Sequence, residues 1–528
     1  MGFRFRKSIK ILPGIRLNLS NGTPSITVGR RGASFTFGSR GIYSNLGLPG
    51  TGLSYRTRLD NPVHATKVNV SANHRNQQIP KVAKNMASQT KQFKGSSGQA
   101  YDILERLAAG GQGTVYKTKC ASDGQFYAVK MYHKHLATPE QKRHIQKLID
   151  HGQPQCNNND IEFIWPIELV EFPGIDSFGY SMKLYDGKHY CHYNKVINGR
   201  QKEPTLDKLC RLSQLVCFAM DAIHRSGLAY CDVNLGNIQF DIENGRIIVC
   251  DNDNVTINNE DTNVIGVPEF MAPEIAKAES QPNASSDLYS IAIMLYQMWT
   301  WEHPMEGQLT AKVRCWDQPA KRKHYADSPL FCHHPTDRSN AADNDPTLSL
   351  SVKRWNKLCP EHLRSHFVTT FTEGVEKPGA RVRLSKWQQI FMELADNVVT
   401  CKHCKAINIF DTKKPNQVCF KCANKLSVAA VLTIKYQGGS AQLIVREGAT
   451  LRQHHTSTDL TNADKVLGLV EIHPKNPSAF IFRNQTNDTW FYEYADKTHK
   501  LEPGQARALL PNMTLSVGNV TLTMELTN

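Results

Sequence analysis

The hydrophobic pattern of the first hundred residues changes near residue 60. Between Gly14 and Tyr55, short β-branched or aromatic runs alternate with glycines and an Asn-Gly pair, a pattern that predicts a meander of β-hairpins. Residues 61–100 are instead rich in Asn, Gln, Ser and Lys and show neither a helical nor a strand period. This composition predicts a flexible linker between the meander and the rest of the chain.

From Tyr101 onward, apolar positions follow both strand and helix periods. Strand-like runs flank a glycine-rich turn, and apolar residues between Leu206 and Ile223 recur at spacings that keep one face of a long helix buried. The segment from Val431 to Asn528 alternates roughly ten short strand-like runs with Gly, Pro and Asn turns, which predicts a β-sandwich. The chain is therefore predicted to be a multidomain α+β protein.

Domain boundaries are placed where these patterns change. At about 150 residues per domain, a chain of 528 residues is expected to hold three or four domains. The predicted parts are a basic β-rich domain at 1–60, a basic linker at 61–100, a mixed domain at 101–396, a cysteine-rich module at 397–426 and a β-sandwich at 430–528.

The net charge of the chain is concentrated at its N-terminal end. The sequence has 63 Lys and Arg against 48 Asp and Glu, a formal charge of +15. Residues 1–100 hold 16 of the basic residues and one acid, Asp60, so that residues 101–528 carry 47 of each sign. The excess is compatible either with solvated loop charge or with binding of nucleic acid or an anionic membrane through residues 1–100.

Cysteine usage and apolar run lengths indicate the compartment. The fourteen cysteines are mostly single and lack the spacing of a disulfide framework, which favours reduced thiols. The longest apolar run, Tyr289 to Trp301, is shorter than the roughly 18 residues needed to cross a bilayer. The N-terminus lacks the apolar segment of a secretory signal. The sequence therefore predicts a soluble, cytoplasmic protein.

An ordered set of glycine-rich and polar motifs lies between residues 107 and 290. A segment with Gly110, Gly111 and Gly113 lies between two strand-like runs, where backbone amides can approach phosphate. The motifs that follow are Tyr127-Ala128-Val129-Lys130, Tyr230-Cys231-Asp232-Val233-Asn234-Leu235-Gly236-Asn237, Asp251-Asn252-Asp253, Gly266 to Glu274 and Ser286 to Ser290. A strand-end lysine supplies a cation for phosphates, while an amide and a carboxylate supply oxygen ligands for Mg²⁺.

In order and spacing, this set resembles the eukaryotic-type (Hanks-type) protein kinase fold across residues 101–396. The resemblance implies a bilobal, kinase-like fold that transfers the γ-phosphate of ATP to a protein Ser or Thr with Mg²⁺. It implies that ATP is bound by Gly110, Gly111, Gly113, Val115 and Lys130, and that Met182 and residues 183–185 form the hinge that contacts adenine. Asp232 would orient and deprotonate the acceptor hydroxyl, and Asn237 and Asp251 would bind Mg²⁺. It also implies that Glu274 pairs with Arg381 and that Asp287 braces the catalytic-loop backbone.

Three positions of the central motifs depart from the family pattern. Cys231 stands where many kinases have Arg, and Asn234 replaces a lysine that contacts the γ-phosphate. The metal loop reads Asp-Asn-Asp, which makes Asp253 a candidate additional metal ligand. These differences remove one cation from the transition-state clamp and argue against control by an arginine that grips a phosphorylated loop.

The helix that should provide the glutamate partner of Lys130 is predicted over residues 138–150. Its first residues, Thr138-Pro139-Glu140-Gln141, have a capping-box pattern. The helix dipole already accounts for a negative charge at Glu140. The partner of Lys130 therefore remains unidentified in the sequence.

These variants resemble a divergent bacterial kinase group that is often joined to zinc modules and linked to a PP2C-type phosphatase and a von Willebrand-type protein. Because Lys130, Asp232, Asn237 and Asp251 are all present, the sequence favours an active kinase in a bacterial signalling or stress-response circuit. One alternative is a pseudokinase scaffold that binds ATP without transfer. Another is a nucleic-acid or membrane binder that acts through its basic N-terminus and is regulated by the kinase.

Four cysteines, Cys401, Cys404, Cys419 and Cys422, form a C-x2-C-x14-C-x2-C pattern. Two such knuckles joined by a short hairpin can place four thiolates tetrahedrally around Zn²⁺. With four protein ligands the metal has no open position, so the pattern predicts a structural zinc ribbon.

Both ends of the chain have further resemblances. Met1 to Arg6 (MGFRFR) and Pro49 to Tyr55 (PGTGLSY) resemble the ends of a short bacterial domain of unknown function. Residues 482–518 are similar to the second half of a forkhead-associated β-sandwich. The Gly-Arg and Ser-x-x-His loops that hold phosphothreonine in that family are absent from the sequence, so the prediction is a degenerate β-sandwich for partner contact.

Overall fold

The computed structural model describes most of the chain from residue 92 onward and several strands before it. The described residues are 6–12, 15–20, 25–30, 33–38, 41–47, 54–58, 92–258, 260, 266–412, 414, 416–460, 462–495, 497–518 and 520–526. They form two compact units, one drawn from residues 1–89 and 312–324 and the other from residues 90–311 and 325–528.

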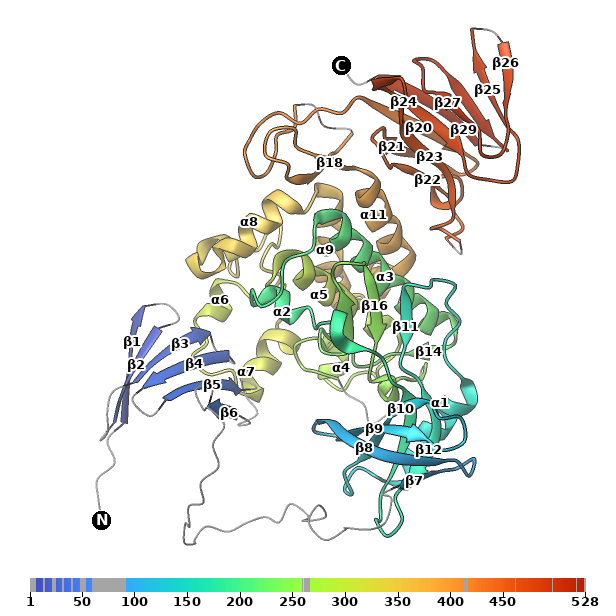
Figure 1. Cartoon of the computed structure of the whole chain (residues 1–528). Helices are drawn as coiled ribbons and strands as arrows, with labels where there is room; N and C mark the ends of the chain where they lie inside the picture. The colour runs from blue at the N-terminus through green and yellow to red at the C-terminus, as the bar shows by residue number, and fades with distance from the viewer. Residues whose placement is uncertain are drawn as a thin grey trace, which may run out of the picture. The chain divides into compact units, whose positions relative to one another are not determined.

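The N-terminal strands form a six-stranded antiparallel sheet in which each strand pairs with its neighbours in sequence. These strands, blue in Figure 1, are β1 (Arg6–Leu12), β2 (Ile15–Ser20), β3 (Ser25–Arg30), β4 (Ala33–Gly38), β5 (Gly41–Gly47) and β6 (Ser54–Arg58). The predicted hairpin meander is confirmed by this strand order.

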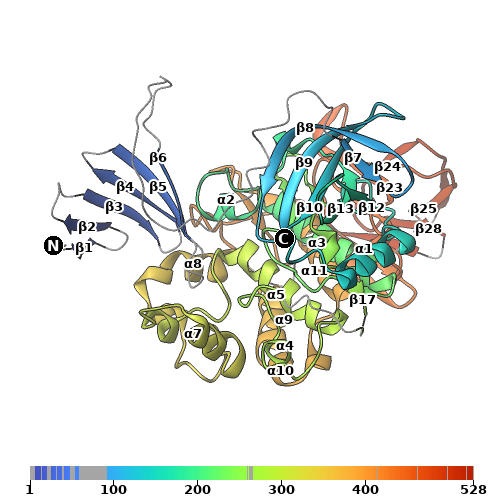
Figure 2. The ribbon, with the colours of Figure 1, turned by 90° about the horizontal axis from the view of Figure 1, so that it is seen from below.

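A closed barrel of six strands, called here the strand lobe, follows in the order β10-β13-β12-β7-β8-β9. Its strands are β7 (Gln92–Gly95), β8 (Ala100–Ala109), β9 (Gly113–Cys120), β10 (Phe126–Tyr132), β12 (Pro166–Glu171) and β13 (Phe178–Lys183). Helix α1 (Pro139–His151) packs against β12, as Figure 2 shows from below.

The predicted linker extends too far at its C-terminal end. Residues 92–95 form β7, which pairs with β8 and β12 and so closes the barrel. Phe93 is 2% exposed and packs with Tyr101 and Val129. The buried Phe93 anchors this strand in the barrel core. The polar average composition of residues 61–100 gives no sign of the strand. Residues 61–91 lie outside the described part of the chain.

Helix α1 begins as the sequence predicts. Thr138 is the N-cap, in extended conformation, and its side-chain oxygen accepts a hydrogen bond from the backbone N–H of Gln141 at 3.2 Å. Pro139 occupies the first helical position, and the helix ends at Gly152, whose φ of 74° lies in the left-handed region.

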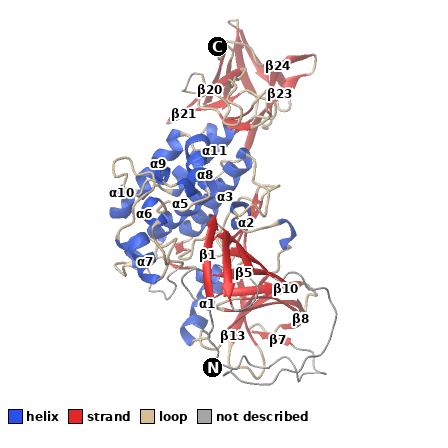
Figure 3. Cartoon of the chain, turned by 90° about the vertical axis from the view of Figure 1, so that its left-hand side faces the viewer, coloured by secondary structure: helices blue, strands red, loops and turns tan. Residues whose placement is uncertain are grey.

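A helical lobe completes the central part of the chain, as Figure 3 shows in blue. Its helices are α2 (Asn194–Ile197), α3 (Leu206–Arg225), α4 (Pro273–Ala276), α5 (Ala284–Thr300), α6 (Gln308–Ala311), α8 (Ser349–Leu358), α9 (Glu361–Phe371), α10 (Glu373–Glu376) and α11 (Leu384–Asp396), while α7 (Gln318–Arg322) belongs to the first unit. Within the lobe, α11 packs along α3, and Trp299 of α5 stacks on Phe391 of α11. No helix among the described residues is long and apolar enough to cross a membrane.

Five short strands flank two loops that carry polar residues. They are β11 (Ile161–Phe163), β14 (Leu228–Ala229), β15 (Ile238–Asp241), β16 (Arg246–Val249) and β17 (Thr256–Ile257). β15 and β16 form a hairpin, and β11 adds to it in parallel, whereas β14 pairs with β17. The loops between these strands hold the segments 230–237 and 251–254.

The segment after α11 forms a small hairpin of β18 (Val398–Thr400) and β19 (Ile407–Ile409), followed by two antiparallel sheets. One sheet has the order β21-β20-β29-β28-β25-β26 and the other β22-β23-β24-β27. The strands are β20 (Ala430–Tyr436), β21 (Gly439–Ile444), β22 (Thr450–Arg452), β23 (Val466–His473), β24 (Asn476–Asn484), β25 (Trp490–Tyr494), β26 (Lys497–Leu501), β27 (Ala506–Ala508), β28 (Thr514–Val517) and β29 (Val520–Leu526).

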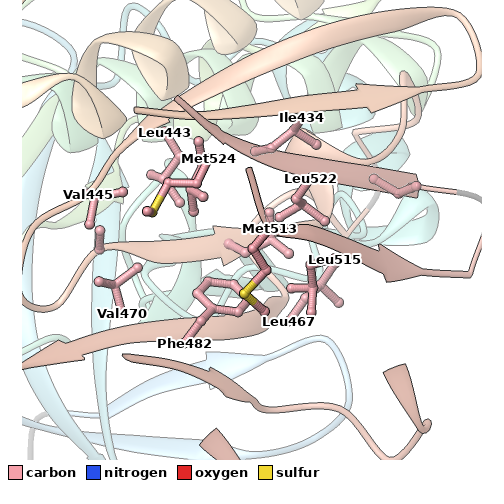
Figure 4. Packing of buried hydrophobic residues seen from close by; sticks show 14 of the residues in the cluster. Ile434, Leu443, Val445, Leu467, Val470, Phe482, Met513, Leu515, Leu522 and Met524 are labelled. Atoms are coloured by element: carbon pink, nitrogen blue, oxygen red, sulfur yellow. The ribbon is translucent and has the colours of Figure 1, made fainter. Parts of the chain in front are cut away.

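The two C-terminal sheets share one apolar core. Ile434 and Leu522 from the first sheet and Val470 and Phe482 from the second belong to the same buried cluster, shown in Figure 4. Polar contacts attach these sheets to the helical lobe, because Asp464 accepts hydrogen bonds from two side chains of α3, Arg211 at 2.5 Å and Gln214 at 3.1 Å.

Candidate active site

Lys130 is a buried cation of the strand lobe that contacts the segment 251–254. It lies near the end of β10, opposite Val115 of β9 and Tyr180 of β13, and is 6% exposed. Its Nζ lies 2.7 and 3.0 Å from the two carboxylate oxygens of Asp253 and 3.6 Å from Asp251. Burial alone would lower the pKa of Lys130, but the two carboxylates raise it above its ordinary value, so the side chain is a cation.

The glycine-rich turn joins β8 and β9 above this lysine. Gly113 packs so tightly that a Cβ there would lie 2.1 Å from the Met131 carbonyl oxygen, whereas a Cβ at Gly110 or Gly111 would meet nothing within 4 Å. The backbone at Gly110 and Gly111 is therefore open to a ligand. At the tip of the turn, Gln112 accepts a hydrogen bond from Lys130 Nζ at 2.7 Å.

The loop that carries Asp232 is held in an uncommon backbone conformation. Cys231 has φ 66°, in the left-handed region. The carboxylate of Asp287, which is 1% exposed, accepts hydrogen bonds from the backbone N–H of Tyr230 at 2.7 Å and of Cys231 at 3.0 Å. The prediction that Asp287 braces this backbone is confirmed by the contacts.

Three amides orient the Asp232 carboxylate. Asn237 donates to its Oδ2 at 2.9 Å and to its carbonyl at 2.8 Å, while Asn234 donates to its Oδ1 at 3.0 Å. Asn254 adds a contact to Oδ2 at 3.3 Å. Asn234 thus gives this carboxylate a neutral hydrogen bond. Burial raises the pKa of Asp232, although the hydrogen bonds from Asn237 and Asn234 oppose this effect.

The oxygen atoms available to a divalent cation come from Asp251 and Asn237. Asp251 has φ 48°, and its side chain is 50% exposed. The amide nitrogen of Asn237 is engaged by Asp232, so its amide oxygen is the atom left for a cation. A carboxylate and an amide oxygen are ligands that Mg²⁺ accepts, so these residues fit that ion.

One face of the barrel provides an apolar surface beside Lys130. In the antiparallel pairing, Val115 lies opposite Lys130, and Met182 lies opposite Ala128. Residues two apart on a strand, and residues directly opposite each other, share a face of a sheet. Val115, Ala128 and Met182 therefore lie on the same face as Lys130.

Glu274 and Arg381 form the predicted ion pair, which is confirmed by its geometry. The two guanidinium nitrogens of Arg381 donate to the two carboxylate oxygens of Glu274, each at 2.7 Å. The Arg381 side chain is fully buried, and its Nε donates to the Gly374 carbonyl at 2.9 Å. The pair joins the start of α4 to the segment before α11.

The role considered for Asp253 as a metal ligand is wrong for this structure. Its side chain is 1% exposed, and both oxygens are taken by Lys130, with Tyr132 OH donating to Oδ2 at 2.5 Å. Glu140 of helix α1 instead pairs with Arg143 on the surface, at 2.9 Å. The sequence did not reveal that Asp253 pairs with Lys130, and the only signal was a second carboxylate two residues after Asp251.

The four cysteines of the C-x2-C pairs converge, each thiol lying within 4.8 Å of the others. The Sγ atoms of Cys401 and Cys422 are 3.7 Å apart, and those of Cys404 and Cys419 are 3.5 Å apart. Four thiolates at about 2.3 Å from Zn²⁺ in a tetrahedron would be about 3.8 Å apart, so the spacing fits zinc. The amide of Asn408 donates to the Cys419 sulfur at 3.5 Å, a contact typical of a metal-bound thiolate.

Comparison with known proteins supports the class of the central domain. Residues 101–338 match the family model described as protein kinase domain, and residues 3–56 match one described as a protein of unknown function, DUF4236. A serine/threonine-protein kinase of Schizosaccharomyces pombe is 25% identical over 231 residues, which cover 40% of this chain and 33% of that protein. A probable serine/threonine-protein kinase of Bifidobacterium longum is 23% identical over 216 residues, which cover 39% of this chain and 27% of that protein. One of Clostridium perfringens is 26% identical over 228 residues, which cover 41% of this chain and 31% of that protein.

These matches assign residues 101–338 to a protein kinase domain and support a protein kinase function. The chain spans about a third of the length of these curated relatives. The two lobes with their mixed strands and helices fit that kinase-like α+β fold. In the structure, the helical lobe continues beyond residue 338 through α11, because Arg381 pairs with Glu274 and α11 packs on α3.

Proposed function

We propose that the protein is an ATP-dependent serine/threonine kinase that transfers the γ-phosphate to a hydroxyl of a protein substrate with Mg²⁺. The observation that carries the proposal is that Asp232, bound by Asn237, interacts electrostatically with Asp251, which lies 3.6 Å from the buried cation Lys130. Such a site needs little covalent chemistry from the protein, because positioning and charge stabilisation account for most phosphoryl-transfer catalysis.

Lys130 and the glycine-rich turn bind the phosphates in this proposal. The Lys130 ammonium offers a hydrogen bond that Gln112 now accepts, and a phosphate oxygen can replace the Gln112 carboxamide. The backbone of Gly110, Gly111 and Gly113 covers the phosphates, because no side chain at the first two glycines blocks the approach. Val115 and Met182 present apolar surface for the adenine.

Asp232 accepts the proton of the substrate hydroxyl in this proposal. Asn234 and Asn237 fix its two carboxylate oxygens, which orients one of them toward an incoming hydroxyl. The raised pKa of Asp232, caused by burial, makes it a better proton acceptor than an exposed carboxylate. Asn237 and Asp251 would hold Mg²⁺, which would supply positive charge to the transferring phosphoryl group.

The proposal is tested with purified chain, γ-labelled ATP and Mg²⁺. Label should appear on a protein hydroxyl, either of the chain itself or of an added substrate protein. If calorimetry detects nucleotide binding but no label is transferred, the pseudokinase scaffold is supported and the enzyme proposal fails.

We also propose that residues 397–426 form a structural zinc ribbon. The ribbon region packs into a small core that includes Val399, Leu426 and Ile444 of β21, so it lies between α11 and the C-terminal sheets. Zinc bound there would rigidify the connection between α11 and the C-terminal sheets, whose apolar core is small.

Purified protein should contain about one zinc per chain, as expected for a single four-thiolate site. Cys404→Ser should lose most of that zinc and unfold at a lower temperature, because structural zinc contributes directly to folding. Metal analysis and thermal unfolding measure the two effects. Cys315→Ser is the matched control, since Cys315 is exposed and outside the cluster. Equal zinc contents in the two variants would refute the site.

The wider setting of the kinase rests on the family resemblance. We propose a cytoplasmic bacterial circuit in which a PP2C-type phosphatase and a von Willebrand-type protein act with this chain, and in which the C-terminal sheets, as a degenerate forkhead-associated-like sandwich, contact a partner. The basic N-terminal residues provide the positive charge for any contact with nucleic acid or an anionic membrane.

A further inference from the structure

We propose that Asp253, rather than a carboxylate of helix α1, is the positioning residue that holds Lys130 for nucleotide binding. This inference rests on the proposed kinase function and deepens it. It assigns to the metal loop the anchoring role that a helix glutamate has in the family pattern. Four observations carry it, concerning the contacts of Lys130, the burial of Asp253, the position of Glu140 and the links from helix α1.

The first observation is how the three donors of the Lys130 ammonium are used. Two hydrogen bonds go to Asp253, at 2.7 and 3.0 Å, and one goes to Gln112, at 2.7 Å. An ammonium group has three donors and no acceptor. The two Asp253 oxygens belong to one carboxylate and approach Nζ from one side, Gln112 approaches from another, and Asp251 lies 3.6 Å away. A phosphate oxygen that approaches from the side of the glycine-rich turn therefore competes with Gln112 for Lys130.

Burial decides which partner is replaced. Gln112 is neutral and lies at the exposed tip of the glycine-rich turn, where its amide also donates to Asn254 at 3.1 Å. Asp253 is 1% exposed, and its Oδ2 also accepts a hydrogen bond from Tyr132. Moving a buried carboxylate away from its cation is costly, whereas a neutral amide can move into water at little cost. Nucleotide should replace Gln112 and leave Asp253 on Lys130.

Helix α1 does not present an acid to Lys130. Glu140 is exposed and bound to Arg143, and the next helical residue is the neutral Gln141. Gln141 donates from its Nε2 to Tyr132 OH at 3.2 Å, and this hydroxyl in turn donates to Asp253. The helix therefore reaches Lys130 through a chain of hydrogen bonds that ends at Asp253.

A second contact ties the helix to the same loop. His144 Nε2 lies 3.1 Å from the Asp253 carbonyl oxygen and donates to it. Gln141 and His144 lie one turn apart on α1, so one face of the helix contacts both the side-chain network and the backbone of Asp253. Helix α1 then orients Asp253, and Asp253 orients Lys130.

The test is a double-mutant cycle of Asp253→Asn and Lys130→Met in the full chain. Each protein is measured for Mg²⁺·ATP affinity by calorimetry, for kcat and KM of phosphate transfer, and for thermal unfolding. Asp253→Asn alone should lower kcat at least tenfold. In the Lys130→Met background the same change should have less than a twofold further effect, because a residue that acts through Lys130 cannot act once Lys130 is absent. Each single variant leaves one member of the buried Lys130–Asp253 pair without its partner, whereas the double variant removes both charges. The double variant can therefore still be compared with Lys130→Met if Asp253→Asn alone folds poorly.

Glu140→Gln is the matched control for loss of a carboxylate near this helix. It should keep kcat and nucleotide affinity within twofold of the wild-type protein. The inference is overturned if Asp253→Asn is folded and fully active, if the two changes are additive, or if Glu140→Gln loses as much activity as Asp253→Asn. If the wild-type protein binds nucleotide but transfers no phosphate, the kinase proposal fails. The Mg²⁺·ATP affinities of the four proteins in the double-mutant cycle still decide whether Asp253 acts through Lys130.

Discussion

Replacing Asp232 with Asn should lower the rate of phosphate transfer by about 10²- to 10⁴-fold, the usual contribution of a positioned general base. The nucleotide affinity should change by only a few fold, because the hydrogen bonds of the Asp232 carboxylate are to the side-chain amides of Asn234, Asn237 and Asn254. The change removes the proton acceptor but keeps the shape of the side chain. Initial rates with labelled ATP and a calorimetric titration with Mg²⁺·ATP measure the two quantities separately.

Asp176→Asn provides the control for this substitution. Asp176 is an exposed carboxylate that pairs on the surface with Lys134, at 3.0 Å, and its loss should leave the transfer rate unchanged. A transfer rate for Asp232→Asn within threefold of the wild-type rate would show that this carboxylate does not accept the proton. A matching loss of nucleotide affinity would instead indicate that the variant had disturbed the orientation of Asn237.

The family resemblance predicted contacts between distant residues when a rigid element fixed each partner. Glu274 and Arg381 are 107 positions apart, yet both lie at helix boundaries, and their pairing is the one that the resemblance implied. Asp287 could be assigned to the backbone of residues 230 and 231 for the same reason, because it lies in the first turn of α5.

The pairing of Lys130 could not be predicted in the same way. It depends on the short 3-10 turn η2 (Asn252–Asn254), which points Asp253 into the strand lobe and leaves Asp251 half exposed. Two carboxylates separated by one residue look equivalent in a sequence. Only the left-handed conformation of Asp251, with φ 48°, separates their directions.

The order of strands in the C-terminal sheets could not be predicted from the sequence either. Alternating apolar residues predicted the strands themselves, since each pattern is local. The pairing of β20 with β29, the first and last strands of this region, joins Ala430 to Leu526 and is not encoded in either strand. The ion pair between Asp464 and Arg211 likewise depends on docking of these sheets on α3.

Glu274→Gln should lower the free energy of unfolding of the helical lobe by about 3–5 kcal/mol, the usual cost of removing one partner of a buried ion pair. The cost is large because the Arg381 side chain is fully buried and would lose the negative charge whose two oxygens now lie at 2.7 Å. It would keep only neutral acceptors, which are one amide oxygen of the new glutamine and the carbonyls of Gly374 and Ser285. Denaturant unfolding of the full chain, followed through the tryptophans, measures the change.

The exposed Arg338–Asp343 pair in the same chain is the matched control, because it has the same chemistry with its two side chains 47% and 49% exposed. Asp343→Asn should cost no more than about 1 kcal/mol, since water screens and replaces a surface ion pair. The contrast tests burial as the cause, because both substitutions replace the carboxylate partner of an arginine with a neutral amide. Equal losses in the two variants would contradict the explanation and would mean that the Glu274 pair is no more important to the lobe than a surface contact.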